Sequence, residues 1–234
     1  MEEEAIVLRC VRINGGRTVV DMLTAAGSRL SAVAAGGKKG GVQRAVLQPM
    51  SIVWTAHGDS QLPRLEGVKL SQPYVSLRYS AIKTALALFT AEFLFNATKG
   101  EHDNSALYDY VRSAMLWLDN CPRSRSVANF HIVLMLRLTT FIGIEPDVNG
   151  YAPGRLFSLR QAAFTADTAA GECLSAAESA IVPTLMRLRL PTMHLLHLSR
   201  QQRADIVNHI IDFYRLHVPA FHQLRSTAVL AQLW

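Results

Sequence analysis

Two adjacent lysines in a glycine-rich stretch are the residues whose type and spacing most clearly indicate chemistry. Lys38 and Lys39 lie in the run Gly36–Arg44, which contains four glycines. Glycine weakens helices and strands but tolerates turns, so this run is predicted to be a loop. Ammonium groups and backbone N–H groups both donate hydrogen bonds to phosphate oxygens. A polyphosphate backbone is therefore the natural ligand of this basic loop, with a solvated hairpin tip as the simpler alternative.

The N-terminal part carries the excess positive charge of the chain. The 234 residues have a formal net charge of +6, and the window from Ala5 to Met50 holds seven basic residues against one acid, Asp21. Such an excess favours anionic partners. Ordinary surface arginines remain the alternative for each residue taken alone, but the set together predicts a phosphate-binding surface. The predicted nucleic-acid-binding residues are Arg9, Arg12, Arg17, Arg29, Lys38, Lys39 and Arg44.

Aromatic side chains that could stack on bases are scarce near these cations. Only Trp54 and Tyr74 are available, and Trp54 lies in an apolar run typical of a core strand. Binding of single strands usually combines a basic groove with stacking aromatics. This region is therefore predicted to contact phosphates rather than to read bases.

No pattern of a catalytic or metal site is present in the sequence. His194 and His197 are three residues apart, but none of the eight histidines belongs to an HExxH motif. A GxSxG motif and a P-loop are absent as well, and the carboxylates are scattered. We therefore expect a protein that is not an enzyme and needs no metal or other cofactor.

The cysteines and the apolar runs bear on the compartment. Cys10, Cys121 and Cys173 lie far apart without a CxxC spacing, which favours neither a disulfide framework nor a zinc site and fits a reducing cytosol. Three glutamates follow Met1, which is the wrong charge for a signal peptide. No apolar run reaches the roughly 20 residues of a membrane span. A soluble cytoplasmic protein is expected, with no membrane partner.

The elements that position the cations are predicted to be the strands of a small barrel. Five short apolar runs are separated by turn signals rich in glycine within about 70 residues, a pattern typical of a closed or nearly closed barrel. The five-stranded oligonucleotide-binding (OB) fold is one such barrel. The predicted strands span residues 5–13, 18–24, 30–35, 46–56 and 62–70.

After Gln72-Pro73-Tyr74 the apolar period changes to that of helices. Ser199 and Gln202 have the spacing of a capping box before the clearest of them. We predict an α+β protein with an OB-fold domain at residues 1–73 and an all-α domain at residues 74–234. The predicted helices include residues 82–97, 107–118, 127–142 and a long segment after 199, with a short one at 226–233. Residues 165–178 are ambiguous, and Pro183 and Pro191 bracket a short apolar piece.

Several motifs follow one another in a specific order almost from end to end of the chain. They are Ala5–Arg9, the lysine pair, Leu47-Gln48-Pro49, Leu88–Leu94, Ala128–His131 with the run to Gly143, Leu156–Arg160 with Phe164, and Tyr214–Phe221 followed by Leu224–Ser226. Their order resembles the RecO family of bacterial recombination mediators, in particular its Bacteroidetes-type members.

The resemblance implies a barrel that binds single- and double-stranded DNA, followed by a helical domain. It further implies annealing of complementary strands, action on DNA coated by single-stranded DNA-binding protein, and loading of RecA together with RecR at the nucleoid. Two departures are visible. The stretch Gly143–Leu156 lacks the four cysteines of the zinc module that many relatives carry, and Ala34–Gly37 replaces the arginine and serines common before the lysine pair.

The family also recognises the acidic, phenylalanine-ended tail of the coat protein on its helical domain. Phe130, Leu134 and Arg137 are spaced to line an apolar pocket with a cationic rim, although plain core packing explains the first two equally well. Two other functions stay open at this point. These are a protein-interaction scaffold and an RNA-binding OB-fold protein without annealing activity.

Overall fold

The computed structural model describes residues 1–34, 47, 49–57, 61–99, 104–122, 127–167, 172–230 and 232. Its contacts divide the chain into two compact units, and each is described by itself. The first holds Met1–Asn120 and Leu224–Leu230, and the second holds Cys121–Gln223 and Ala231–Trp234. The strands end near the predicted domain boundary at residue 73, but the next two helices belong to the first unit. The boundary between domains at residue 73 stays a prediction.

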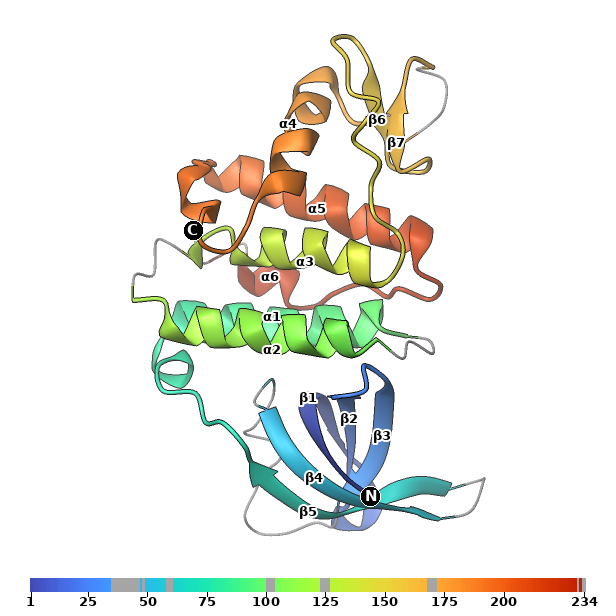
Figure 1. The fold of residues 1–234 in the computed structure, drawn as a ribbon, viewed down its shortest axis with the longest axis vertical. Helices are drawn as coiled ribbons and strands as arrows, with labels where there is room; N and C mark the ends of the chain where they lie inside the picture. The colour runs from blue at the N-terminus through green and yellow to red at the C-terminus, as the bar shows by residue number, and fades with distance from the viewer. Residues whose placement is uncertain are drawn as a thin grey trace. The chain divides into compact units, whose positions relative to one another are not determined.

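The first unit begins with the predicted barrel (Figure 1). Five strands close in the order β1-β2-β3-β5-β4, with β1 also paired to β4, and only β3 and β5 run parallel. This is the arrangement of an OB fold, so the predicted α+β class with an N-terminal barrel and following helices is confirmed. The strands are β1 (Glu2–Arg12), β2 (Thr18–Thr24), β3 (Arg29–Ala34), β4 (Pro49–His57) and β5 (Gln61–Leu70).

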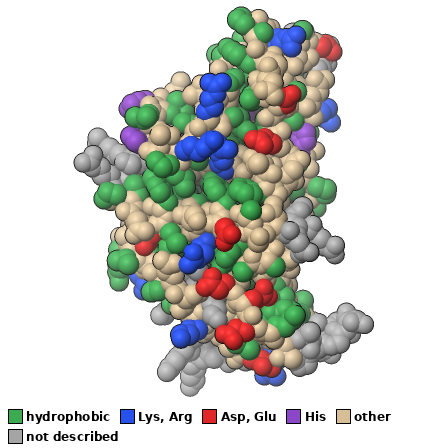
Figure 2. Space-filling model, in the orientation of Figure 1, with side chains coloured by type: hydrophobic (Ala, Val, Ile, Leu, Met, Phe, Trp, Pro, Cys, Tyr) green, Lys and Arg blue, Asp and Glu red, His purple; other side chains and the backbone are tan. Residues whose placement is uncertain are grey.

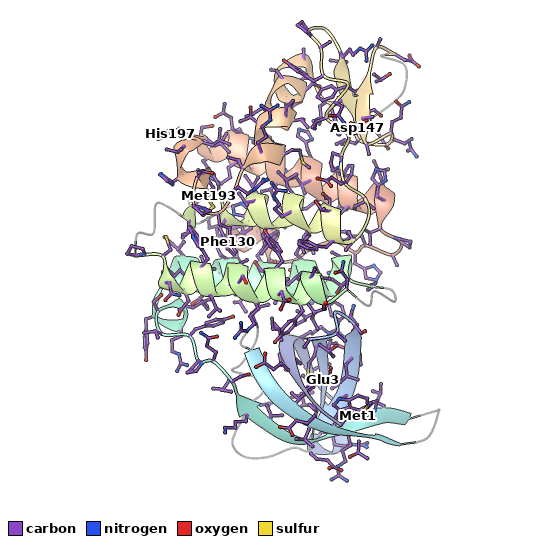
Figure 3. All side chains as sticks on the ribbon, in the orientation of Figure 1. Met1, Glu3, Phe130, Asp147, Met193 and His197 are labelled. Atoms are coloured by element: carbon purple, nitrogen blue, oxygen red, sulfur yellow. The ribbon has the colours of Figure 1, made fainter. Side chains whose placement is uncertain are left out.

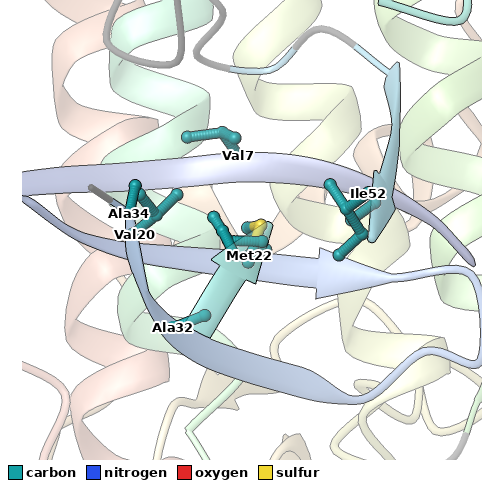
Figure 4. Close-up of a cluster of buried hydrophobic side chains, with 8 residues drawn as sticks. Val7, Val20, Met22, Ala32, Ala34 and Ile52 are labelled. Atoms are coloured by element: carbon teal, nitrogen blue, oxygen red, sulfur yellow. The ribbon is translucent and has the colours of Figure 1, made fainter. Parts of the chain in front are cut away.

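Alternation along the strands places one set of apolar side chains inside the barrel (Figure 4). The described core includes Val7, Val20, Met22 and Ile52, each fully buried. The turn between β1 and β2 is the predicted one: Gly15 and Gly16 both have positive φ, at 78° and 71°, which glycine adopts without strain. The hydrophobic pattern and the turn chemistry therefore agree on the same barrel.

The connection from β5 to the first helix is fixed by one carboxylate. Asp119, at the end of α2 (Ser105–Asn120), is 5 % exposed. It accepts backbone N–H bonds from Val75 at 2.8 Å, Ser76 at 2.8 Å and Leu77 at 2.6 Å. The buried ammonium of Lys83 donates to the main-chain carbonyl of Asp119 at 2.8 Å. These bonds hold the pKa of the Asp119 carboxyl below its usual range, against the opposing effect of its burial.

Helix α1 (Ala81–Ala97) packs on β1 and also receives the last helix of the chain, α6 (Thr227–Leu230). Glu92 on α1 accepts backbone N–H bonds from Arg225 and Ser226, both at 2.8 Å. Those donors belong to the residues just before α6, where unpaired N–H groups favour a negative charge. Residues that are more than 130 positions apart in the chain are thereby joined within one unit.

The second unit is built on three helices and a small hairpin. Helix α3 (Phe130–Phe141) packs against α4 (Ala176–Arg187) and α5 (Arg200–His217). The capping box of Ser199 and Gln202 at the start of α5 is confirmed. Two short strands, β6 (Leu156–Ser158) and β7 (Ala163–Thr165), pair antiparallel. The sequence predicted only helices for this part, so the hairpin is an addition to the predicted fold.

Helix α4 runs through Pro183, where the sequence favoured an interruption. A proline inside a helix costs about 3 kcal/mol because it lacks the N–H donor and its ring clashes with the preceding turn. Val182 and Leu185 on either side are buried, and their packing offsets that cost. Within the described residues, none of the helices combines the length and the apolar character required to cross a bilayer.

Candidate nucleic-acid interface

Two of the predicted arginines converge on one aromatic ring of α1. The guanidinium carbon of Arg9, on β1, lies over the Phe95 ring at 4.4 Å from its centroid, and that of Arg29, on β3, lies over the same ring at 4.3 Å. Arg29 also donates to the Phe95 carbonyl at 2.7 Å. Lys99, just beyond α1, is 6.0 Å from the ring centroid. The fold thus gathers three cations from three separate segments.

Asp21 is the acid that faces this cluster. It is 7 % exposed, accepts a 2.6 Å bond from the Ser31 hydroxyl, and lies 3.5 Å from Nε of Arg9. Its position on β2, between the strands that carry Arg9 and Arg29, follows from the barrel register. Among the residues that the structure describes, Asp21 is one carboxylate beside the three cations of the cluster.

The neighbouring charges affect the titration of the cations themselves. The pKa of Lys99 is lowered, first by partial burial and then by the charges of Arg29 and Arg9. The pKa of Arg29 is lowered by burial and by Arg9, while Asp21 acts in the opposite direction. Like charges held close together are stabilised by a bound anion. The Phe95 cluster, meaning Arg9, Arg29, Lys99 and Phe95 with Asp21, is therefore suited to hold a phosphate.

The remaining described arginines of the predicted set lie apart from this cluster. Arg12 ends β1 and pairs in register with Thr18, and Arg17 directly precedes β2. Both side chains are exposed. Lys38, Lys39 and Arg44 lie outside the described residues. The structure therefore brings Arg9 and Arg29 together and places Arg12 and Arg17 at the end of the β1–β2 hairpin.

Both aromatic residues considered for base stacking make hydrogen bonds within the first unit. Trp54 is half-buried against the barrel core and donates from Nε1 to Glu3 at 3.0 Å. Tyr74 is 2 % exposed, and its hydroxyl donates to the Leu47 carbonyl at 2.6 Å. Phe95 was missed by sequence reasoning, and its ring is covered by guanidinium groups. Phosphate contact is the mode of binding that these side chains allow.

On the face that Figure 2 shows, acidic and basic side chains are interspersed rather than segregated. Net charge alone does not mark the interface. The candidate interface is marked instead by the individual contacts of the Phe95 cluster and by the exposed pair Arg12 and Arg17 at the hairpin.

The three residues predicted to line a partner pocket do not share one surface. Phe130, labelled in Figure 3, and Leu134 are fully buried in the second unit. Arg137 is half-buried and donates to the carbonyl of Met186 at 3.3 Å. Core packing, the alternative considered for Phe130 and Leu134, describes both residues, and only Arg137 remains near a surface.

An apolar cavity of about 380 Å³ lies next to Arg137 in the same unit. Leu136, beside Arg137, and Met186, its hydrogen-bond partner, both line it. Most other lining residues are aliphatic or aromatic, including Phe157 of β6 and Ile206 and Phe213 of α5. A concave apolar site with few polar groups is the usual form of a ligand pocket.

Two polar groups of the lining join α4 to α5. Nε2 of His209 lies 2.8 Å from Oε1 of Glu178, while Oε2 of Glu178 accepts bonds from the hydroxyl and N–H of Ser175. The Ser175 hydroxyl, then His209, lower the pKa of Glu178 to about 2. Among the described residues no group of three or more potential metal ligands is present.

Nearly the whole chain is similar to known proteins. A family model described as "Recombination protein O C terminal" matches residues 78–227. The DNA repair protein RecO of Bacteroides fragilis is 34% identical over 236 residues, which cover 98% of this chain and 97% of that protein. The protein of the same name from Phocaeicola vulgatus has the same identity and coverage. That of Flavobacterium psychrophilum is 25% identical, covering 100% of this chain and 93% of its own.

Proposed function

Because the chain belongs to the RecO family of DNA repair proteins, we propose that it binds single- and double-stranded DNA through its barrel and anneals complementary strands. We further propose that it mediates loading of RecA onto DNA coated with single-stranded DNA-binding protein, together with RecR, in the cytoplasm at the nucleoid. The observation that supports DNA binding most directly is the Phe95 cluster, where three cations face one buried acid.

Annealing requires no bond chemistry. Two polyanions must approach each other, and cations that neutralise phosphates reduce their repulsion. Arg9 and Arg29 are held in place by the ring of Phe95, so they lose little side-chain freedom when a phosphate binds. Arg12 and Arg17 are exposed on the same barrel and can extend the contact along a strand. The described barrel thus offers two arginines held against Phe95, which are Arg9 and Arg29, and two exposed arginines at the β1–β2 hairpin, which are Arg12 and Arg17.

Replacing Arg12 and Arg17 together by alanine should weaken DNA binding to a similar degree for unrelated sequences. Each lost phosphate contact reduces the slope of log K against log salt by about 0.7 to 0.9, so the double variant should flatten the slope by about 1.5. Fluorescence anisotropy with a labelled oligonucleotide at several salt concentrations measures this. The control is Arg160→Ala, an exposed arginine of the second unit that is paired with Glu172. An unchanged slope in the double variant would remove these residues from the interface.

The alternatives of an RNA-binding barrel and of a scaffold without nucleic-acid binding give different results in one experiment. Filter binding of single-stranded DNA, RNA and heparin at two salt concentrations separates them. The proposed function requires binding of DNA and pairing of complementary oligonucleotides. Preference for RNA, or no binding to any of the three, contradicts it.

We also propose that the acidic tail of single-stranded DNA-binding protein inserts its apolar end into the cavity beside Arg137. Leu136 and Met186 supply apolar surface next to that guanidinium. Glu178 and Asp205 also belong to the lining. The carboxylates of the tail are therefore expected at the Arg137 end, where a cation attracts them and these two acids do not repel them.

The variant Arg137→Glu should weaken binding of a labelled acidic peptide ending in phenylalanine by at least tenfold. Its affinity for naked single-stranded DNA should stay within twofold of the wild type, because Arg137 lies outside the barrel. Arg155→Glu, at an exposed position of the same unit, is the matched control. Equal losses of peptide and DNA binding in Arg137→Glu would argue against a separate tail site.

A further inference from the structure

The connection between α4 and α5, residues 188–199, and the helix ends that flank it form a second place where exposed basic side chains gather. The sequence contains no acidic residue between Glu178 and Asp205, whereas it contains four arginines and two histidines there. Five of these six side chains are exposed, and they are Arg187, Arg189, His194, His197 and Arg200. We name these five residues the α4–α5 basic surface. The net charge of the chain does not reveal this surface, because acidic residues elsewhere in the sequence offset the charge of its arginines.

The connection is held in one conformation by a buried amide. The side-chain nitrogen of Asn129, which is 3 % exposed, donates to the carbonyls of Met193 at 2.9 Å and Leu196 at 2.8 Å. Figure 3 labels Met193 and His197 on this connection. One amide thus fixes two carbonyls of the loop, and its own carbonyl oxygen remains to be satisfied.

Arg203 satisfies it. The Nε of Arg203 donates to Oδ1 of Asn129 at 3.1 Å, and its Nη2 donates to the Leu198 carbonyl at 3.2 Å. The side chain is buried, which lowers its pKa. A buried charge that is hydrogen-bonded in this way fixes the geometry around it. Asn129 and Arg203 together fix the conformation of the loop that carries the α4–α5 basic surface.

The start of the connection is equally well ordered. The carbonyl of Arg189 accepts N–H bonds from Thr192 at 3.1 Å and Met193 at 2.9 Å, which closes a turn. Its guanidinium donates to the carbonyls of Arg187 and Leu188 at the end of α4. Cations at a helix C-terminus are stabilised by the helix dipole. Arg189 therefore has a structural role in stabilising the end of α4. Arg187 and Arg200 lie at the helix ends on either side of the loop.

We propose that the α4–α5 basic surface binds the phosphate backbone of a second DNA strand. This inference rests on the proposed annealing function and adds a second site to it. Pairing two strands is helped when both are held and partly neutralised, and the cations of the barrel account for one. The five side chains follow one another along a preorganised loop, so binding a strand costs little ordering of the protein.

A polyanion fits this surface better than an acidic peptide does. None of the five residues lines the apolar cavity, whereas a peptide ligand gains much of its affinity from an apolar anchor in a pocket. Arginine forms paired hydrogen bonds with phosphate oxygens in particular. Basic side chains that lie outside the cavity lining and follow one another along a loop are suited to contact with a nucleic-acid backbone, which positions a strand without reading its sequence.

The test uses the full-length double variant Arg187→Gln with Arg200→Gln, which leaves the helix-capping Arg189 in place. Binding of a labelled decathymidine is titrated to obtain both the affinity of the first strand and the number of strands bound per protein. The wild type should bind two strands and the variant one, with first-strand affinity within twofold. Annealing of complementary oligonucleotides by the variant should slow by about tenfold or more.

The barrel variant Arg12→Ala with Arg17→Ala should show the reverse pattern, with a weakened first strand. If the wild type binds two strands and the α4–α5 variant binds one, but neither anneals, the second site stands and the proposed annealing function fails. If the variant still binds two strands at unchanged affinity, the second site is refuted even where annealing is observed. Loss of acidic-peptide binding by a variant that keeps both strands would also refute it, by assigning the surface to protein. Thermal melting monitored by circular dichroism verifies that the variant is folded.

Discussion

Replacing Asp119 by alanine is expected to lower the free energy of unfolding of the first unit by about 4 kcal/mol, the largest effect of any single substitution considered. Hydrogen bonds to a charged group contribute about 1.5 to 3 kcal/mol each, and a buried donor left without a partner costs about 1 to 3 kcal/mol. Here three consecutive N–H groups, those of Val75, Ser76 and Leu77, would lose their acceptor. For a chain of this length the melting temperature should fall by roughly 10 °C.

Tryptophan fluorescence is the appropriate measurement, since Trp54 and Trp117 both lie in the first unit. Asp109→Ala is the matched control because it removes an exposed carboxylate from the same helix. The intermediate variant Asp119→Asn should lose less than alanine, because the amide retains one acceptor oxygen. A melting temperature of Asp119→Ala within 2 °C of the wild type would contradict the role assigned to this carboxylate.

Acid should destabilise the second unit well before carboxylates begin to protonate. His131 is 1 % exposed, and burial, with a smaller effect of the Arg203 charge, lowers its pKa to about 3. An unfolded histidine titrates near 6.5. Because the folded pKa is depressed, the unfolded state binds the extra proton between these two values. The contribution of neutral His131 is thus complete above about pH 6.5 and is lost as the pH falls.

The expected slope is about 1.4 kcal/mol per pH unit, or about 3 kcal/mol between pH 7 and pH 4.5. Urea unfolding monitored by far-ultraviolet circular dichroism at pH 7, 6, 5 and 4.5 measures it. In His131→Gln, whose side chain takes up no proton, the free energy of unfolding should change much less over this range. His222→Gln, at an exposed position, is the control for replacing a histidine. A slope that is the same in His131→Gln and the wild type would contradict this assignment.

The barrel could be predicted from the sequence because its signals are local. Alternating apolar residues and Gly15-Gly16 specify strands and a turn over a few positions, and the capping residue Ser199 marks the start of α5 in the same way. Helix α4 was harder to predict, because the packing of the residues around Pro183 outweighs the low helix propensity of proline. The pair of three-residue strands at Leu156–Ser158 and Ala163–Thr165 is too short to produce a clear period.

The candidate site was predictable in composition but not in geometry. The arginines were identified from their charge and spacing, whereas Phe95 is 66 positions from Arg29 in the chain. No local pattern links an aromatic residue on a helix to guanidinium groups of two strands. The partner-tail pocket stays a prediction, and its spacing shows the same limit of local patterns. A spacing of three and four places Phe130 and Leu134 on one helical face, but it does not say whether that face is the buried one.

The path of the backbone has a consequence for how this protein is made. In the first unit Glu92 accepts the N–H groups of Arg225 and Ser226, and about a hundred residues of the second unit are translated between these partners. A ribosome that has released residues 1–120 has produced a barrel and two helices without their closing segment. Expression of that fragment alone therefore omits a native piece of its own fold, and shortening the carboxyl end would damage the unit that begins at the amino end.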